Sequence, residues 1–149
     1  MSLRAVLLTS FLLWAACASV QAATVIKKKL PDGRRITVAE GPAEPRSIGS
    51  FALRLYSGVN PKGPQDDFLG GRIDERDGFL ESVEMIDLIG DKVPELIVVL
   101  RNVGTSSSLD LHVYQINKSG FELVRSFASL DKAIRPAQFL QEQFPLESR

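Results

Sequence analysis

The pattern of hydrophobic and polar positions is clearest in residues 83–117, which we interpret as three strands joined by short connections. Residues 83–87 and 109–116 mix apolar and polar side chains, whereas residues 96–100 (Leu-Ile-Val-Val-Leu) are apolar without interruption. Alternate side chains of a half-solvated strand would face water, so an unbroken apolar run is typical of a strand with apolar contacts on both faces. We therefore expect residues 95–102 to form the central strand of the fold.

Further strands are predicted before and after this stretch. Strand-like alternation, with some irregularity, is found in four segments: residues 24–30, 34–39, 51–56 and 121–127. The first two flank Pro31-Asp32-Gly33, where proline presets the turn and glycine adopts positive φ, so they predict a β-hairpin. The glycine and proline content of residues 40–50 and 57–72 predicts irregular structure there.

Turns recur at short intervals along the chain, including Arg76-Asp77-Gly78-Phe79 just before the central stretch. About seven or eight short strands with little helix predict an all-β fold, an antiparallel β-sandwich or barrel. The tail, residues 130–144, is compatible with a short C-terminal helix interrupted at Pro136. No internal repeat or linker divides residues 23–149, which we expect to form a single domain.

The first 22 residues have the organisation of a secretory signal peptide. A single basic residue, Arg4, precedes an apolar run, and Val20-Gln21-Ala22 provides a small-x-small pattern for cleavage after Ala22. A membrane anchor is an alternative, but it needs about 20 continuous apolar residues, and this run is shorter. Cys17 raises a third alternative, a lipoprotein signal, in which Trp14 would stand where leucine is expected. We expect an exported protein that has lost residues 1–22.

Removing the signal peptide would leave 17 basic and 18 acidic side chains and no cysteine. A balanced charge gives no electrostatic attraction to nucleic acid or to an anionic membrane. A chain without cysteine has neither a disulfide nor thiol chemistry, so its fold depends on its hydrophobic core. We therefore expect no nucleic-acid partner and no membrane contact after cleavage.

Basic residues nevertheless cluster in the first hairpin, at Lys27, Lys28, Lys29, Arg34 and Arg35. This cluster could be a patch for an acidic partner. Lysines on an edge strand also form a solvated face and protect the sheet edge against aggregation. We favour this second interpretation from the sequence.

The side chains available for catalysis are few. The single histidine, His112, follows Asp110 by two residues in a predicted strand, so both would share one face, and a nearby loop serine could complete a Ser-His-Asp set. No nucleophile elbow accompanies them. We therefore interpret His112 as a partly buried structural residue and expect the protein not to be an enzyme. Asp66 and Asp67 are interpreted as solvated turn residues, because neighbours in an extended segment point in opposite directions.

An acidic turn precedes the central strand. Asp87, Asp91 and Glu95 are spaced as in calcium-binding turns, where carboxylates converge on the cation. Ile89 and Lys92 occupy positions at which such loops carry oxygen ligands or glycine, and the Lys92 ammonium would stand where the ion should lie. We interpret the turn mainly as a structural element that sets strand register. Calcium binding is the weaker alternative, and we expect no cofactor.

The loop after the central strand is rich in hydroxyl groups. It contains four consecutive hydroxyl-bearing residues, Thr105, Ser106, Ser107 and Ser108. If the protein binds a partner through one loop, this loop is the first candidate. Arg101, Asn102 and Gly104 are candidates for supporting its conformation. The alternative is an ordinary serine-rich hairpin loop.

Several sequence blocks resemble those of a known family. They are Glu44-Pro-Arg-Ser-Ile-Gly-Ser50, which is the most specific, Leu53-Arg-Leu-Tyr56, Arg76-Asp-Gly78, and Asp87-Leu-x-Gly-Asp91 with Pro94-Glu95. Together with the apolar run they are similar to the periplasmic inhibitors of invertebrate-type (i-type) lysozyme, exported proteins of Gram-negative bacteria. The resemblance implies a periplasmic β-sandwich, often a homodimer, that inserts a loop into the catalytic cleft of i-type lysozyme.

In that family the inserted loop carries a Ser-Gly-x-Tyr motif just after the central strand. Its four positions correspond here to Thr105, Ser106, Ser107 and Ser108. The resemblance implies that Thr105 donates a hydrogen bond to a lysozyme carboxylate, since ionised carboxylates only accept. Two other functions stay open: a non-catalytic periplasmic binding or adhesion module that could bind calcium, and inhibition of another lysozyme class.

Overall fold

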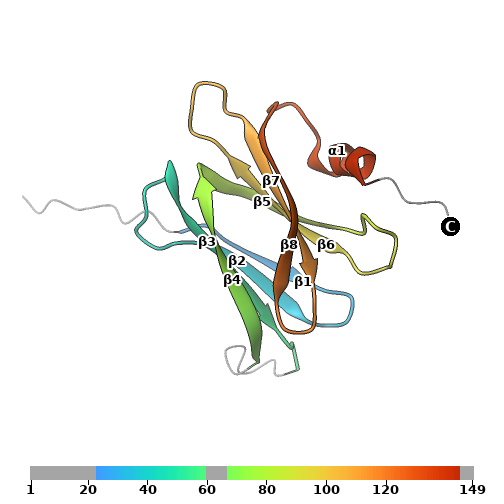
Figure 1. Ribbon diagram of the computed structural model, residues 1–149. Coiled ribbons are helices and arrows are strands. Elements are labelled where there is room, and N and C mark those ends of the chain that lie inside the picture. Colours follow the sequence, from blue (N-terminus) through green and yellow to red (C-terminus); the bar gives the residue numbers. More distant parts are fainter. Residues whose placement is uncertain (1–22, 60–66, 145–149) are drawn as a thin grey trace, which may run out of the picture.

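A computed structural model describes residues 23–59 and 67–144, which form two four-stranded antiparallel sheets packed face to face (Figure 1). The first sheet consists of β1 (Val25–Lys29), β2 (Arg35–Glu40), β3 (Ile48–Tyr56) and β4 (Phe68–Asp77). The second consists of β5 (Phe79–Ile86), β6 (Glu95–Arg101), β7 (Leu109–Ile116) and β8 (Phe121–Leu130), followed by the helix α1 (Pro136–Gln143). The prediction of an all-β sandwich with a short C-terminal helix is confirmed. The expected signal peptide, residues 1–22, lies outside the described residues.

Each sheet is built from strands that are consecutive in the sequence. The chain passes from the first sheet to the second at Gly78, between β4 and β5. Gly78 has a φ of 89°, a left-handed conformation that glycine adopts without steric strain. A Cβ atom at this position would collide with the backbone of Arg101 and Asn102. The crossing therefore packs directly against the end of β6.

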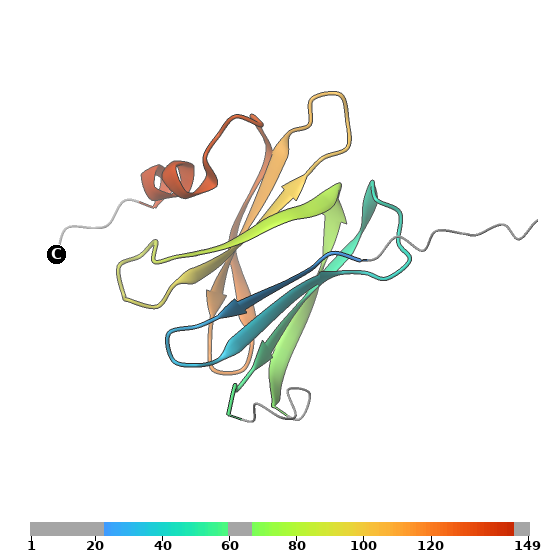
Figure 2. The same cartoon turned by 180° about the vertical axis from the view of Figure 1, so that it is seen from behind.

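The central position of β6 is confirmed, because every residue from Glu95 to Leu100 is buried. Leu96, Val98 and Leu100 belong to the core between the two sheets. Ile97 and Val99 face the other way, into a second core that includes Leu140 of α1. Figures 1 and 2 show α1 on the outer side of the second sheet, where it covers this second core. The unbroken apolar run thus reflects a strand with apolar neighbours on both faces.

The predicted hairpin between β1 and β2 is also present. The N–H of Leu30 donates to the carbonyl of Arg34 (2.8 Å) and that of Gly33 to the carbonyl of Leu30 (3.0 Å). Gly33 supplies the left-handed residue, with a φ of 93°. Among the described residues, no helix is both long enough and apolar enough to span a membrane.

Three sequence predictions need correction. β3 already begins at Ile48, and β4 begins at Phe68, inside segments predicted to be irregular. α1 is not interrupted at Pro136 but begins there. Proline fits the first turn of a helix, because the N–H it lacks would have no partner there and its ring presets a helical φ.

The misassignment of β4 has a physical cause. Pairing with β3 places Arg72 and Asp74 opposite the inward-facing Leu53 and Phe51, so the inward face of β4 is charged. The apolar Ile73 points outward and is 71% exposed. This arrangement inverts the usual relation between polarity and burial on which strand prediction depends.

Candidate functional site

The hydroxyl-rich loop, residues 102–108, connects β6 to β7 at one end of the sandwich. Its base is closed by a hydrogen bond from the N–H of Asn102 to the carbonyl of Ser108 (2.9 Å), and its tip by one from the N–H of Ser107 to the carbonyl of Gly104 (3.1 Å). Residues 103–106 are exposed. Within the described part of the chain, the hydroxyl groups of Thr105 and Ser106 have no hydrogen-bond partner. Two free hydroxyl groups therefore stand at the tip of a closed hairpin.

The other two hydroxyl residues have a different position. Ser107 and Ser108 are half-buried at the base. Ser107 adopts a left-handed conformation with a φ of 48° and so makes the turn. The Ser108 hydroxyl accepts a hydrogen bond from the Asn102 side-chain amide (Nδ2 to Oγ, 3.0 Å). The four predicted binding residues thus divide into an exposed pair at the tip and a half-buried pair at the base.

Arg101 connects the loop to the neighbouring strand β5. Its Nη1 donates to the carbonyl of Ser107 at 3.0 Å. Its Nη2 donates to Glu81 Oε1 at 2.6 Å, and its Nε pairs with Glu81 Oε2. This carboxylate raises the pKa of Arg101 above its ordinary value, mainly by accepting the side-chain hydrogen bond. A two-point contact of this kind fixes the guanidinium plane, and through it the carbonyl of Ser107.

Asn102 connects the base of the loop to the rest of the second sheet. Its Nδ2 lies 3.2 Å from Asp110 Oδ1, and the same oxygen accepts a hydrogen bond from the N–H of Ser129 at 2.7 Å. Gly104 contributes its carbonyl, as described above. A Cβ atom at Gly104 would meet nothing within 4 Å, so a side chain would fit there. Arg101 and Asn102 therefore contact the loop directly, whereas Gly104 has no steric reason to be glycine.

A second loop, residues 41–47, lies at the same end of the sandwich and is organised by Arg76 of β4. The Arg76 side chain is only 3% exposed. It donates to two backbone carbonyls of this loop, Arg46 (3.2 Å) and Pro45 (3.2 Å), and to the carbonyl of Ser50 in β3 (3.0 Å). Its Nη1 also donates to the carbonyl of Gly78. Arg76 thus holds the loop between β2 and β3 against the crossing between the sheets.

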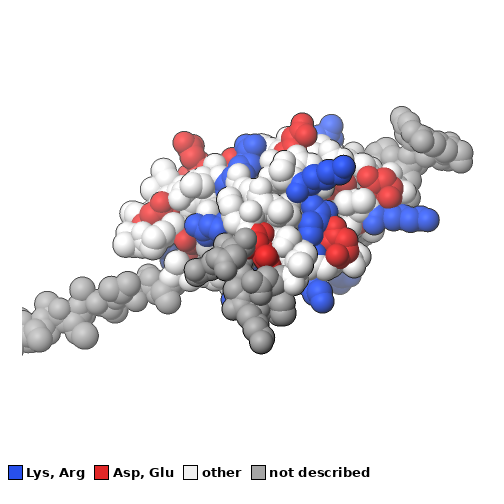
Figure 3. Space-filling model, turned by 90° about the horizontal axis from the view of Figure 1, so that it is seen from below, with Lys and Arg blue, Asp and Glu red and all other residues white. Residues whose placement is uncertain are grey.

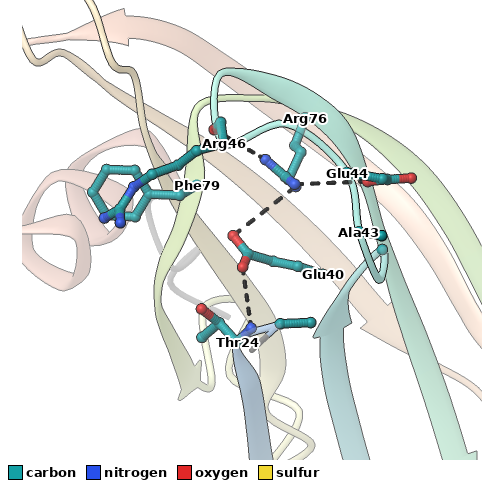
Figure 4. A pocket seen from close by; sticks show the side chains of 9 residues that line it. Thr24, Glu40, Ala43, Glu44, Arg46, Arg76 and Phe79 are labelled. Atoms are coloured by element: carbon teal, nitrogen blue, oxygen red, sulfur yellow. Dashed lines mark hydrogen bonds and ion pairs between the residues drawn. The ribbon is translucent and has the colours of Figure 1, made fainter. Parts of the chain in front are cut away.

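Two carboxylates balance the charge of Arg76, as Figure 4 shows. Its Nη2 lies 3.6 Å from Glu44 Oε2, and its Nε lies 4.0 Å from Glu40 Oε1. Hydrogen bonds from the N–H and hydroxyl of Ser50 hold the pKa of Glu44 below its ordinary value, with a further contribution from Arg76. Burial raises the pKa of Glu40, but the hydrogen bond from the N–H of Leu80 (2.8 Å) helps to bring it below its ordinary value. Both groups therefore remain ionised beside the guanidinium.

The Arg76 cluster (Glu40, Glu44 and Arg76) and the hydroxyl-rich loop meet at Gly78. The N–H of Gly78 donates to the carbonyl of Ser47 at 2.7 Å, and the backbone of Arg101 lies so close to Gly78 that it leaves no room for a side chain. Sequence reasoning missed this cluster. Arg76 bonds to carbonyls 26 to 31 residues away, and no local pattern announces such a partner. The only signal was that the Glu44–Ser50 and Arg76–Gly78 blocks both contributed to the family resemblance.

A family model described as "Periplasmic lysozyme inhibitor of I-type lysozyme" (PliI) matches residues 22–144. The chain belongs to the PliI family. Two solved structures are similar to it. PliI-Ah from Aeromonas hydrophila is 38% identical with a TM-score of 0.72, and the match covers 78% of this chain and 98% of that one. A. hydrophila PliI in complex with Meretrix lusoria lysozyme is 37% identical with a TM-score of 0.73, covering 79% and 95%. No curated protein matches the chain.

In this PliI chain the carboxylates of the acidic turn bind the turn itself. Asp87 accepts hydrogen bonds from the N–H groups of Gly90 (2.7 Å) and Lys92 (2.9 Å). Asp91 accepts one from Val93 at 2.8 Å. Glu95, 4% exposed, accepts one from the N–H of Leu88 at 2.8 Å. Within residues 23–59 and 67–144, no group of three or more His, Cys, Asp or Glu side chains is arranged to hold a metal ion.

His112 packs between aromatic rings. Its ring lies edge-on to Phe51 (centroids 5.7 Å apart) and is stacked with Tyr114 (6.3 Å). Burial lowers its pKa, although Asp74 and Asp110 oppose this shift. Its Nδ1 is buried and has no hydrogen-bond partner in the described structure. Asp110 Oδ1 accepts hydrogen bonds from Asn102 and Ser129, and among the described residues no hydrogen bond joins His112 to Asp110 or to a loop serine, so the structure does not assemble these residues into a catalytic set.

Of the two acidic residues that precede β4, Asp67 lies 3.5 Å from the Arg35 guanidinium and its carbonyl accepts a hydrogen bond from the N–H of Ser57 at 2.8 Å. The Asp67 side chain is 12% exposed, so it is not a fully solvated turn residue. Asp66 lies outside the described residues.

Proposed function

We propose that this protein inhibits I-type lysozyme and that the tip of the 102–108 loop enters the catalytic cleft of the enzyme. The observation that carries the proposal is the pair of exposed hydroxyl groups on Thr105 and Ser106, which stand at the tip of a loop held at its base. Membership of the PliI family supports the inhibitory function. A related A. hydrophila protein has been crystallised in complex with a Meretrix lusoria lysozyme, which supports lysozyme as the partner.

The chemistry of the tip matches a lysozyme cleft. Most glycoside hydrolases use a pair of carboxyl groups that flank the scissile bond. An ionised carboxylate can only accept hydrogen bonds, and a hydroxyl group can donate one. Hydrogen bonds to a charged acceptor are shorter and stronger than those between neutral groups. Thr105 and Ser106 would therefore bind the catalytic carboxylates and exclude the sugar from them.

The supports of the loop favour binding by reducing its entropic cost. Ordering a flexible side chain at an interface costs about 0.5–1.5 kcal/mol. Arg101 and Asn102 already fix the carbonyl of Ser107 and the hydroxyl of Ser108 before any partner arrives. We propose that these two residues, together with the Gly104 carbonyl, act through the loop conformation and not by contacting the enzyme.

Export is part of the same proposal. The family match begins at residue 22, close to the expected cleavage site after Ala22. We propose that the inhibitor acts in the periplasm as residues 23–149. Mass spectrometry of the protein recovered from a periplasmic extract would identify the first residue of the mature chain. A chain that retains residues 1–22 would contradict this part of the proposal.

The test is a cell-wall lysis assay in which residues 23–149 are added to I-type, chicken-type and goose-type lysozymes in parallel. We expect inhibition of the I-type enzyme only. The double variant Thr105→Ala/Ser106→Ala should inhibit at least about tenfold less well, a loss of about 1.4 kcal/mol in binding. Ser119→Ala, which removes an exposed hydroxyl from the turn at the opposite end of β7, is the matched control and should inhibit normally.

Two results would overturn different parts of this proposal. Failure to inhibit any of the three enzymes would contradict the inhibitory function itself. Normal inhibition by the Thr105→Ala/Ser106→Ala variant would remove the loop tip from the mechanism while leaving the inhibitory function intact. A homodimer, which the family resemblance implies, is tested separately by sedimentation equilibrium.

A further inference from the structure

The outer face of the first sheet carries a cluster of basic residues that the inhibitory function does not use. Strand pairing places Lys27, Thr37 and Arg54 in one row across β1, β2 and β3, and Lys29 and Arg35 in the adjacent row. Ile36, Val38, Leu53 and Leu55 alternate with them along β2 and β3 and are buried in the core between the sheets. The four cations Lys27, Lys29, Arg35 and Arg54, here called the basic face, therefore point to the same side.

The basic face concentrates charge in a small area. Neighbouring strands lie about 4.8 Å apart and alternate residues of a strand about 7 Å apart, so the four Cα atoms lie within roughly 12 Å of one another. Figure 3, a view from below, shows basic and acidic side chains interspersed on that side of the molecule. The whole chain has a formal net charge of zero, so this density of positive charge is a local feature.

The positive charges of the basic face are mostly not balanced within the protein. Arg35 lies 3.5 Å from Asp67. Lys27, Lys29 and Arg54 form no ion pair with any described residue. Lys29 stands directly opposite Arg35 in the β1–β2 ladder, and like charges in that position destabilise a sheet. Asp67 offsets part of this repulsion at Arg35, whereas no described acidic residue pairs with Lys29.

Protection of the sheet edge accounts for only part of the basic face. β1 is an edge strand, so Lys27 and Lys29 can serve to prevent strand addition. β2 and β3 lie inside the sheet and are paired on both sides. Arg35 and Arg54 therefore do not protect an edge, and Arg54, unlike Arg35, pairs with no described acidic residue.

An aromatic pair borders the basic face. Tyr56 lies opposite Arg35 in the β2–β3 ladder, and its ring contacts that of Phe68 edge-on, with centroids 5.9 Å apart. Phe68 is 55% exposed. A shallow groove of about 500 Å³ is lined by Lys27, Lys29, Arg35, Thr37 and Tyr56, among others. Exposed aromatic rings offer a flat apolar surface on which a sugar ring can pack. Binding of a charged lipid headgroup does not need such a surface, so the aromatic pair favours a sugar ligand.

We propose that the basic face binds the peptidoglycan of the bacterial cell wall, whose stem peptides carry free carboxylates and whose glycan strands supply sugar rings. An extended polyanion can contact several cations at once and releases its counterions when it binds. The basic face lies towards the β1–β2 hairpin, which contacts the turn after β7 through the hydrogen bond from Arg34 Nη1 to the carbonyl of Asn117 (2.6 Å). The 102–108 loop precedes β7, at its other end. The protein can therefore bind the wall and present its loop at the same time.

The test is cosedimentation of residues 23–149 with purified insoluble peptidoglycan over a series of salt concentrations. The wild-type protein should sediment at low salt and be released as salt rises, because salt screens each contact between a cation and a carboxylate. Lys27→Glu/Arg54→Glu should sediment at least about tenfold less well. Lys132→Glu/Arg135→Glu makes the same charge change on exposed residues before α1 and should behave as wild type. Thermal unfolding of both variants shows that they are folded.

Each contrary outcome overturns the proposal in a different way. No sedimentation of the wild-type protein at low salt would exclude a wall-binding face. Equal losses in both double variants would mean that only net charge matters. Binding to phosphatidylglycerol vesicles and not to peptidoglycan would replace the glycan by a lipid surface. The Lys27→Glu/Arg54→Glu variant should inhibit soluble lysozyme as well as the wild type does. Loss of wall binding and loss of the inhibitory function are therefore measured separately.

Discussion

The two connections that flank β6 use polar side chains in opposite ways. In the acidic turn before the strand, the Asp87, Asp91 and Glu95 carboxylates all accept hydrogen bonds from backbone N–H groups of the turn. In the loop after the strand, the hydroxyl groups of Thr105 and Ser106 accept and donate none among the described residues. The loop takes its support from outside, through Arg101 and Asn102.

This difference separates polar groups that build the fold from those that are available to a partner. These carboxylates are directed at the backbone of their own turn and do not converge on one point, although their spacing in the sequence is that of a calcium loop. A free hydroxyl on a fixed backbone keeps its full capacity for an external acceptor. The comparison predicts that changes in the turn alter stability, whereas changes in the loop and its supports alter inhibition.

The largest effect is expected from Arg76, whose cluster meets the loop after β6 at Gly78. Arg76→Ala would leave two carboxylates and several carbonyls without their donor. Removing one partner of a buried ionic cluster costs about 3–5 kcal/mol, so the free energy of unfolding in urea should fall by that amount. Arg135→Ala, at an exposed position, should change it by less than about 0.5 kcal/mol. A loss below about 1 kcal/mol at Arg76 would show that the cluster does not stabilise the fold.

A smaller effect, on binding and not on folding, is expected at Arg101. Arg101→Ala releases the carbonyl of Ser107, and the inhibition constant for I-type lysozyme should rise about tenfold, or about 1.4 kcal/mol. The free energy of unfolding should fall by less than about 1 kcal/mol, because the ion pair with Glu81 is partly exposed. Arg101→Lys should restore little, since lysine cannot form the two-point contact. Unchanged inhibition would remove Arg101 as a positioning residue.

Asp87→Ala tests the other side of the comparison. It removes the acceptor of two backbone hydrogen bonds at an exposed turn, and the free energy of unfolding should fall by about 1 kcal/mol. Inhibition of I-type lysozyme should be unchanged, because the turn lies at the far end of β6 from the loop. A measured loss of inhibition without a loss of stability would contradict the division of roles.

The smallest effect is a pH dependence at Glu95. Burial raises the pKa of this carboxyl, Asp91 and Asp87 raise it further, and the Leu88 N–H opposes the shift. Because the folded pKa is above the unfolded one, the contribution of Glu95 to stability is fully present below the unfolded pKa and is lost as pH rises through the folded pKa. Glu95→Gln does not titrate. The stability of the wild type relative to this variant, measured in urea titrations, should therefore decrease as the pH rises above the ordinary pKa of a glutamate, about 4.3. A constant difference would contradict the shift.

Much of the fold could be predicted from the sequence, because most strands obey the simple relation between polarity and burial. β6 is the clearest case, since alternate side chains of its apolar run pack into two cores, one between the two sheets and one covered by α1. β4 could not be predicted, because Arg72 and Asp74 point inward and bind each other and Tyr114. The Arg72 Nε lies 2.6 Å from Asp74 Oδ2, which accepts the Tyr114 hydroxyl at 2.7 Å. Such a polar interior is stable only in the context of the other sheet.

The candidate site was predictable in place but not in detail. The run of hydroxyl residues identified the loop, yet nothing in the sequence distinguished the exposed Thr105 and Ser106 from the half-buried Ser107 and Ser108. That distinction depends on the turn hydrogen bond to Gly104 and on the left-handed Ser107. The Arg76 cluster was not predictable at all, because its members are distant in the sequence and are brought together only by the two-sheet fold.

The single crossing at Gly78 also has a kinetic consequence. Every strand pair joins neighbours in the sequence, so each sheet is one continuous half of the folded chain. Contacting strands are therefore consecutive in the sequence, and the mean sequence separation of contacts is lower than in sandwiches whose strands exchange between sheets. Folding rates rise as this separation falls. We expect each half to assemble hairpin by hairpin and the rate-limiting step to be the docking of two preformed sheets around one glycine.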